Sequence, residues 1–197
     1  MTDFNEFPKI SRLFRDVILT EKIDGTNSSI TISPVLLGKT NPEESAIVRD
    51  ATGNPMALRA GSRTRWIKPT DDNFGFARWV HDHADELVKL GVGQHFGEWW
   101  GKGIQRGYGL QERRFSLFNT SRWDDEDVRP ACCHVVPTLY VGPMDSTYIR
   151  QIAWQLEQGG SEAAPGFMDP EGIVVFHSHS NSLFKYTIKN DQHKEQR

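Results

Sequence analysis

The sequence predicts an α+β fold with much antiparallel sheet, because short β-patterned segments are joined by turns and only two segments have helical periodicity. The helical segments are residues 73–90 and 146–158. Elsewhere, runs of apolar and β-branched residues are short and end at glycine, asparagine, aspartate or proline, which is typical of strands joined by tight turns. No repeat or low-complexity linker interrupts the pattern, so a single domain over residues 1–197 is expected.

The predicted strands are bounded by turn residues. The first two flank the turn Asp-Gly-Thr-Asn at 24–27, and the next two flank a hairpin loop at 50–55. The segment around Pro137 lacks one amide N–H, so it is expected to be an edge strand or an irregular one. The predicted strands are 17–23, 28–33, 46–48, 56–60, 93–99, 114–119, 135–141, 171–176 and 182–188.

Each predicted helix has one apolar face and ends at glycine. In residues 73–90 and 146–158, apolar residues recur at intervals of three and four positions, which places them on the side that a sheet would cover. Gly91 stops the first helix and Gly159 with Gly160 stops the second. The tail 191–197 is expected to fray. The apolar faces consist of Val80, Ala84, Leu87 and Val88 in the first helix and of Ile149, Ile152, Ala153 and Leu156 in the second.

The composition favours a soluble globular protein. Hydrophobic residues make up 37% of the chain and charged residues 25%, which separates it from disordered chains. The net charge is −3, whereas proteins that hold many phosphates usually have a basic excess. Any contact with nucleic acid must therefore come from a local patch or from a partner.

Three features predict a cytoplasmic location without membrane contact. No apolar run approaches the ~20 residues that span a bilayer. The acidic N-terminus MTDFNEF lacks the basic and apolar segments of a signal peptide. The two cysteines, Cys132 and Cys133, are neighbours, which suits neither a disulfide nor a zinc site, so a reducing compartment is expected.

Lys22 stands at the end of the first predicted strand, followed by Asp24 and Gly25. Alone, Lys-x-Asp-Gly is a weak signal, because Asp-Gly is a common turn and an exposed lysine beside it needs no function. Five further segments, taken in their order along the chain, indicate that Lys22 has a chemical role. The six segments are TEKIDGTN (20–27), RAGSRTRW (59–66), FGEWWGKGIQ (96–105), RRFSLFN (113–119), PEGIVV (170–175) and LFKYTIKND (183–191).

These segments resemble motifs I, Ia, III, IIIa, IV and V of the covalent nucleotidyltransferases, which include ATP-dependent RNA ligases, DNA ligases and mRNA capping enzymes. Motif III has the form found in RNA ligases of the phage RNA ligase 2 type. The resemblance covers about residues 8–194 and implies the adenylyltransferase fold, an ATP-grasp-like pair of antiparallel sheets with flanking helices and the nucleotide between them. No C-terminal OB domain is expected, because the chain ends soon after motif V.

The activity implied by the resemblance is that of an ATP-dependent RNA ligase. Lys22 would attack the α-phosphorus of ATP and form a covalent lysyl-AMP. Because lysine attacks only as the neutral amine, a nearby cation such as Lys185, Lys189 or a bound metal would favour loss of its proton. The AMP would next pass to the 5′-phosphate of an RNA end. A 3′-hydroxyl would then attack that end and release AMP.

The resemblance also implies the other catalytic groups. Glu171 is expected to lie near Lys22 and to bind the metal, which would be Mg²⁺ or Mn²⁺. Lys185 is expected to meet the α-phosphate as a point charge. Glu171 also has a structural explanation, since a glutamate at this place could simply cap the entry to a strand.

Five residues are implied to bind the nucleotide. Glu98 would hold a ribose hydroxyl, and Phe118 would stack on adenine, although an exposed strand carboxylate and a core aromatic are the structural alternatives. Arg63 would contact the ribose or the incoming phosphate, unless it belongs to a solvated basic face. Glu21 would help to recognise adenine. Lys189 would serve as the second lysine of motif V.

Three positions depart from the family pattern. Asp24 stands where RNA ligases of this branch often carry histidine, although aspartate fits the wider superfamily. The second motif V lysine usually lies two positions after the first; here it is Lys189, which would share a face with Lys185 if the strand continued. Asn119 replaces the aspartate that usually follows the stacking aromatic.

Other functions and partners stay open. The chain could adenylylate or seal DNA ends, use GTP as capping enzymes do, or act as a catalytically idle nucleotide-binding module in an RNA repair complex. The expected partners are RNA ends, including those of a nicked duplex. An accessory protein or domain supplied in trans is also expected, because binding without one should be weak and salt-sensitive.

Overall fold

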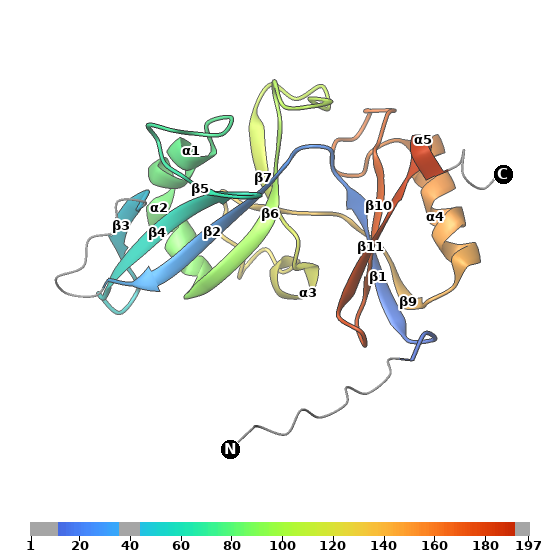
Figure 1. The fold of residues 1–197 in the computed structure, drawn as a ribbon, viewed down its shortest axis with the longest axis horizontal. Coiled ribbons are helices and arrows are strands. Elements are labelled where there is room, and N and C mark those ends of the chain that lie inside the picture. Colours follow the sequence, from blue (N-terminus) through green and yellow to red (C-terminus); the bar gives the residue numbers. More distant parts are fainter. Residues whose placement is uncertain (1–11, 36–43, 192–197) are drawn as a thin grey trace, which may run out of the picture. The chain divides into compact units, whose positions relative to one another are not determined.

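The structure is a computed structural model that describes residues 12–35 and 44–191 (Figure 1). Two compact units form within it. Unit 1 takes in Met1–Lys22, Thr138–Glu162 and Met168–Arg197, and unit 2 takes in Ile23–Pro137 and Ala163–Phe167. The acidic N-terminus and residues 192–197 of the tail expected to fray lie outside the described residues.

Unit 1 is a four-stranded antiparallel sheet with a long helix packed on one face (Figure 1). The strand order is β11-β10-β1-β9. β1 is therefore an inner strand, paired with β10 and β9. The elements are β1 (Asp16–Lys22), β9 (Thr138–Pro143), α4 (Ser146–Gly159), β10 (Gly172–His177), β11 (Ser182–Thr187) and α5 (Ile188–Asp191).

The core of unit 1 lies between the sheet and α4. Val17 and Leu19 of β1 pack with Ile173 of β10, and all three are fully buried. Ala153 and Leu156 of α4 complete this cluster, as the helical periodicity predicts. Because side chains alternate along a strand, Ile18, Thr20 and Lys22 project from the opposite face.

Unit 2 is a larger sheet in the order β3-β4-β2-β6-β7-β8, with β5 paired to β4. Of the strand pairs in the described residues, β7 with β8 alone is parallel. The strands are β2 (Thr26–Pro34), β3 (Ala46–Arg49), β4 (Pro55–Ser62), β5 (Trp66–Ile67), β6 (Gly93–Gly101), β7 (Arg113–Leu117) and β8 (His134–Val135).

The single helix predicted over residues 73–90 is wrong in its extent. The structure contains α1 (Phe76–Asp82), α2 (Ala84–Leu87) and the 3-10 turn η1 (Val88–Leu90). The break falls at His83, whose φ of −111° is not helical and whose Nδ1 lies 2.9 Å from the carbonyl oxygen of Trp79. The apolar face is nevertheless buried against the sheet as predicted. A short helix, α3 (Thr120–Trp123), was not predicted.

Three strand predictions need correction. The predicted strand 135–141 is two strands in different sheets, β8 and β9, and Pro137 lies between them. β7 ends at Leu117, so the predicted strand 114–119 is too long. β11 ends at Thr187 because the chain turns into α5 at Ile188.

Two further expectations concern the cysteines and the membrane. Cys132 and Cys133 are free, with their sulfur atoms 4.0 Å apart, and the hydrogen bond to Cys132 together with burial raises the pKa of the Cys133 thiol. Within the described part of the chain, no helix has the length and apolar character to cross a membrane.

Candidate active site

Lys22 and Glu171 form an ion pair at one end of the unit 1 sheet. The antiparallel register pairs Lys22 with Gly172, which brings the end of β1 beside the start of β10. Lys22 Nζ lies 2.5 Å from Glu171 Oε1, and the two side chains are 25% and 15% exposed. Motifs that are far apart in the sequence therefore meet as the resemblance implies, and the lysine amine remains partly open to solvent.

The second oxygen of the Glu171 carboxylate has no partner. Glu171 Oε2 is buried and accepts no hydrogen bond from any described residue. A buried carboxylate oxygen without a partner is costly, so such groups call for an explanation. This oxygen provides unused acceptor capacity beside Lys22 that could be satisfied by a bound cation or a ligand hydroxyl.

Lys185 projects from the same face of the unit 1 sheet as Lys22. The register aligns Thr187 with Gly172 and Lys22, and it aligns Lys185 with Val174 two positions further along. Directly paired residues and those two positions apart share a face. Lys185 is exposed, and it lies two strand spacings, about 10 Å, across the sheet from β1.

Lys189 does not extend the strand face of Lys185, so that part of the prediction is wrong. It lies in α5, where strand alternation does not apply. Its Nζ is 2.7 Å from Asp169 Oδ1, and both side chains are largely exposed, at 65% and 49%. An exposed ion pair of this kind contributes little to stability and is easily exchanged.

Glu21 points to the opposite face of the sheet from Lys22, as neighbouring strand residues must. It is 1% exposed, and its Oε1 accepts a hydrogen bond of 2.6 Å from the Ser161 hydroxyl. Ser161 follows the end of α4. Glu21 is thus held inside unit 1.

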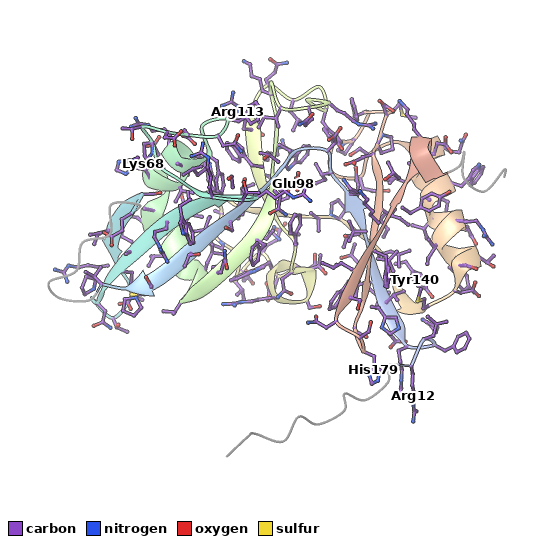
Figure 2. All side chains as sticks on the ribbon, in the orientation of Figure 1. Arg12, Lys68, Glu98, Arg113, Tyr140 and His179 are labelled. Carbon is purple, nitrogen blue, oxygen red and sulfur yellow. The ribbon has the colours of Figure 1, made fainter. Side chains whose placement is uncertain are left out.

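In unit 2, Glu98 lies near the middle of β6 (Figure 2). It pairs with Asn27 of β2 and Ser116 of β7, and its Oε1 accepts a hydrogen bond of 3.1 Å from the Gly25 amide. A Cβ at Gly25 would lie 2.6 Å from the Trp99 carbonyl oxygen, which explains why glycine is needed where the chain passes this carboxylate.

Phe118 and Arg63 both present side chains to solvent on unit 2. Phe118 follows β7, is 38% exposed, and donates its amide to the Phe96 carbonyl at 3.0 Å. Phe96 is 49% exposed and shares with Glu98 the face of β6 away from the core. Arg63 is exposed between β4 and β5 and makes no hydrogen bond or ion pair with a described residue.

Two residues that hold Asp24 were not identified from the sequence. Arg106 Nε lies 2.9 Å from Asp24 Oδ2, and the Asp24 amide donates to the Tyr108 hydroxyl at 2.7 Å. Tyr108 is 2% exposed and packs edge-on against Trp100. The glycines of residues 101–109 signal a turn, but nothing in their spacing indicates that the turn reaches back to Asp24.

We expect Asp24 and Arg106 to be coupled in stability. Asp24→Asn and Arg106→Gln should each lower the free energy of unfolding, and the double variant should lose less than the sum. The expected coupling is about 0.5–1 kcal/mol, because both side chains are partly solvated. Chemical denaturation of the four proteins measures it, and strictly additive losses would contradict the ion pair.

Comparison with known proteins identifies the family of this chain and solved structures with a similar fold. The family model for RNA ligase matches residues 15–187. Structures of Naegleria gruberi RNA ligase variants align at 16% identity: one with AMP and Mn at a TM-score of 0.60, covering 94% of this chain and 53% of that chain, and one with ATP and Mn at 0.57, covering 93% and 52%. No curated protein matches in sequence.

The chain spans about half the length of these solved structures. At this identity the likeness concerns the fold alone. It confirms the fold class that the sequence predicts, a mixed α+β nucleotidyltransferase domain with two sheets in which antiparallel pairing dominates.

Proposed function

Because the chain belongs to the RNA ligase family, we propose that it is an ATP-dependent RNA ligase that forms a covalent lysyl-AMP on Lys22. The observation that carries this proposal is the contact between Lys22 Nζ and Glu171, two residues that the family motifs single out. The structures of the Naegleria enzyme with ATP or AMP and Mn support the choice of nucleotide and of a divalent metal.

In the first step the neutral amine of Lys22 attacks the α-phosphorus of ATP. A nitrogen–phosphorus bond forms, the bond to the β-phosphate oxygen breaks, and pyrophosphate leaves. Lys22 Nζ forms an ion pair with Glu171 at 2.5 Å, and because an ammonium nitrogen has no lone pair, it must release a proton to solvent before attack. Placement of Lys22 on an inner strand fixes the position of the amine, which favours in-line attack.

Lys185 is proposed to meet the α-phosphate. Its place on the same sheet face as Lys22 supports this role, and as an exposed ammonium it would offset the negative charge that develops during transfer. Lys189 is proposed as a further phosphate contact. Its ion pair with Asp169 is exposed, so exchanging that carboxylate for a phosphate would cost little.

Glu171 fits a role in holding Mg²⁺ or Mn²⁺. Mg²⁺ commonly binds through one or two carboxylates together with substrate phosphates and water, so a single carboxylate suffices. The buried Oε2 of Glu171 has acceptor capacity that no described residue uses. When bound, the metal would neutralise charge on the triphosphate.

The remaining contacts are proposed for the nucleoside. Glu98 would accept a hydrogen bond from a ribose hydroxyl, and the exposed ring of Phe118 would stack on adenine. Arg63, which has no described partner, would contact the ribose or the incoming phosphate. Glu21 would take part in adenine recognition. In this role its carboxylate would accept a hydrogen bond from adenine as well as the one from the Ser161 hydroxyl.

In the later steps AMP passes to the 5′-phosphate of an RNA end, and a 3′-hydroxyl of a second end attacks that phosphate and releases AMP. We propose RNA ends, including those at a nick, as the substrate. An accessory protein or domain in trans would supply further affinity for the strand, since the chain has a net charge of −3.

The function is tested by a sealing assay. Protein with ATP and Mg²⁺ is expected to join a 5′-phosphorylated RNA end to an adjacent 3′-hydroxyl on a nicked duplex, and to do so poorly with GTP or with nicked DNA. Faster sealing of DNA would make the chain a DNA ligase, and a preference for GTP would indicate a capping-type enzyme. If the protein forms no adduct and seals no end with any combination of nucleotide and strand, the remaining alternative is a catalytically idle nucleotide-binding module.

A further inference from the structure

Phe74 of unit 2 has an unusual backbone and an exposed ring. Its φ is +50°, a left-handed conformation that is a genuine outlier for a bulky residue, and its side chain is 45% exposed. Its carbonyl oxygen accepts two hydrogen bonds, from Trp99 Nε1 at 2.9 Å and from Arg113 Nη1 at 2.8 Å. These contacts fix the strained segment and hold the aromatic ring at the surface.

Arg113 is held rigidly without a counterion. Its Nη1 donates to the Phe74 carbonyl, and its Nε donates at 3.0 Å to the carbonyl of Lys102. No described carboxylate pairs with the Arg113 guanidinium, whose side chain lies at the surface of unit 2 (Figure 2). A guanidinium placed by main-chain carbonyls is preorganised to bind an anion with its remaining N–H groups.

Lys102 adds a second cation, and the neighbouring acids are already engaged. The Lys102 side chain is exposed and makes no hydrogen bond or ion pair with a described residue. Glu112 pairs with Arg114 at 2.7 Å. The Asp72 carboxylate accepts hydrogen bonds from the amides of Asn73, Ala77 and Arg78 at the start of α1. The Lys102 and Arg113 side chains therefore carry positive charge that no ion pair with a described residue offsets.

We propose that Phe74, Lys102 and Arg113 form a nucleotide-binding subsite for the RNA strand, separate from the residues assigned to ATP. A base would stack on Phe74 and the adjoining phosphate would contact Arg113 and Lys102, the combination of aromatic ring and cations with which proteins bind single strands. The inference rests on the proposed function. The loop that carries Lys102 also holds Asp24 through Arg106 and Tyr108, so the subsite and Asp24 are joined by one loop of unit 2.

Fluorescence anisotropy with a labelled 5′-phosphorylated oligouridylate, in the absence of ATP, tests the subsite. Phe74→Asn removes the ring, while asparagine tolerates the left-handed backbone; affinity should fall about tenfold with an unchanged salt dependence. Lys102→Gln should weaken binding severalfold and reduce the slope of log affinity against log salt by about 0.7, the value for one phosphate contact on a single strand.

Arg49→Gln is the matched control. Arg49 is also an exposed arginine of unit 2 that donates to a main-chain carbonyl, that of Gly53, and its loss should leave the affinity unchanged. Equal affinities of wild type, Phe74→Asn and Lys102→Gln, or no binding by wild type at low salt, would overturn the subsite. Because the assay contains no ATP, these results are independent of whether Lys22 becomes adenylylated.

Discussion

Replacement of Lys22 by alanine is expected to abolish the covalent AMP adduct completely, because no other group can provide the attacking amine at the end of β1. Wild-type protein incubated with ATP and Mg²⁺ should gain the mass of one AMP, and Lys22→Ala should gain none. Intact-protein mass spectrometry measures both. The effect is all-or-none, since the variant lacks the nitrogen on which the intermediate forms.

Lys22→Arg separates the chemistry from the ion pair. Arginine can keep the contact with Glu171 but stays protonated and cannot attack phosphorus, so the variant should fold and form no adduct. Lys89→Ala, which removes an exposed lysine of η1 in unit 2, should form the adduct at the wild-type rate. An adduct on Lys22→Arg would contradict the assignment of the nucleophile.

Replacement of Glu171 by glutamine is expected to slow adduct formation by about a hundredfold or more, the size of effect typical for loss of a positioned catalytic carboxylate. The change removes the negative charge beside Lys22 Nζ and one ligand of the proposed metal while preserving side-chain shape. The concentration of Mg²⁺ or Mn²⁺ that gives the half-maximal rate should also rise. Time courses of the mass shift at several metal concentrations measure both effects.

Glu162→Gln provides the control for Glu171→Gln, because it makes the same chemical change at an exposed carboxylate of unit 1. It should leave the rate and the metal dependence unchanged. Thermal unfolding of both variants shows whether either has lost its fold. A folded Glu171→Gln protein with the wild-type rate at every metal concentration would remove Glu171 from the mechanism.

The proximity of Lys22 and Glu171 was implied by the family resemblance and not by the strand pattern. Lys22 ends β1 and Glu171 precedes β10, and the antiparallel register that joins these strands leaves no signal in the sequence. The hydrophobic faces of α1 and α4 were predictable from the sequence, since burial follows periodicity. The apolar face of α1 packs into the core of unit 2, and that of α4 packs into the core of unit 1.

Features set by local breaks in pattern were not predictable in the same way. Alternation placed Lys189 on the face of Lys185, but the chain turns into a helix at Ile188, and this four-residue helix is too short to show a helical period in the sequence. The break at His83 likewise falls inside an otherwise helical pattern, at a residue whose side chain contacts Trp79.

Polar contacts between residues far apart in the sequence were the second kind of feature that could not be predicted. Arg106 and Asp24 are separated by 82 positions, and Arg113 lies 39 positions from Phe74, so neither pair leaves a local signature. The positive φ of Phe74 is equally invisible, because phenylalanine is not a residue that favours it. Such contacts depend on where the loop after β6 folds back, which is set by the packing of Ile104 and Tyr108.

The most direct test of the central claim is to locate the AMP. Protein exposed to ATP and Mg²⁺ is digested under conditions that preserve the phosphoramide bond, and tandem mass spectrometry identifies the modified residue. The account predicts AMP on the peptide that contains Lys22, attached to that lysine. AMP on Lys185 or Lys189, or a protein that starts without AMP and acquires none, would contradict it.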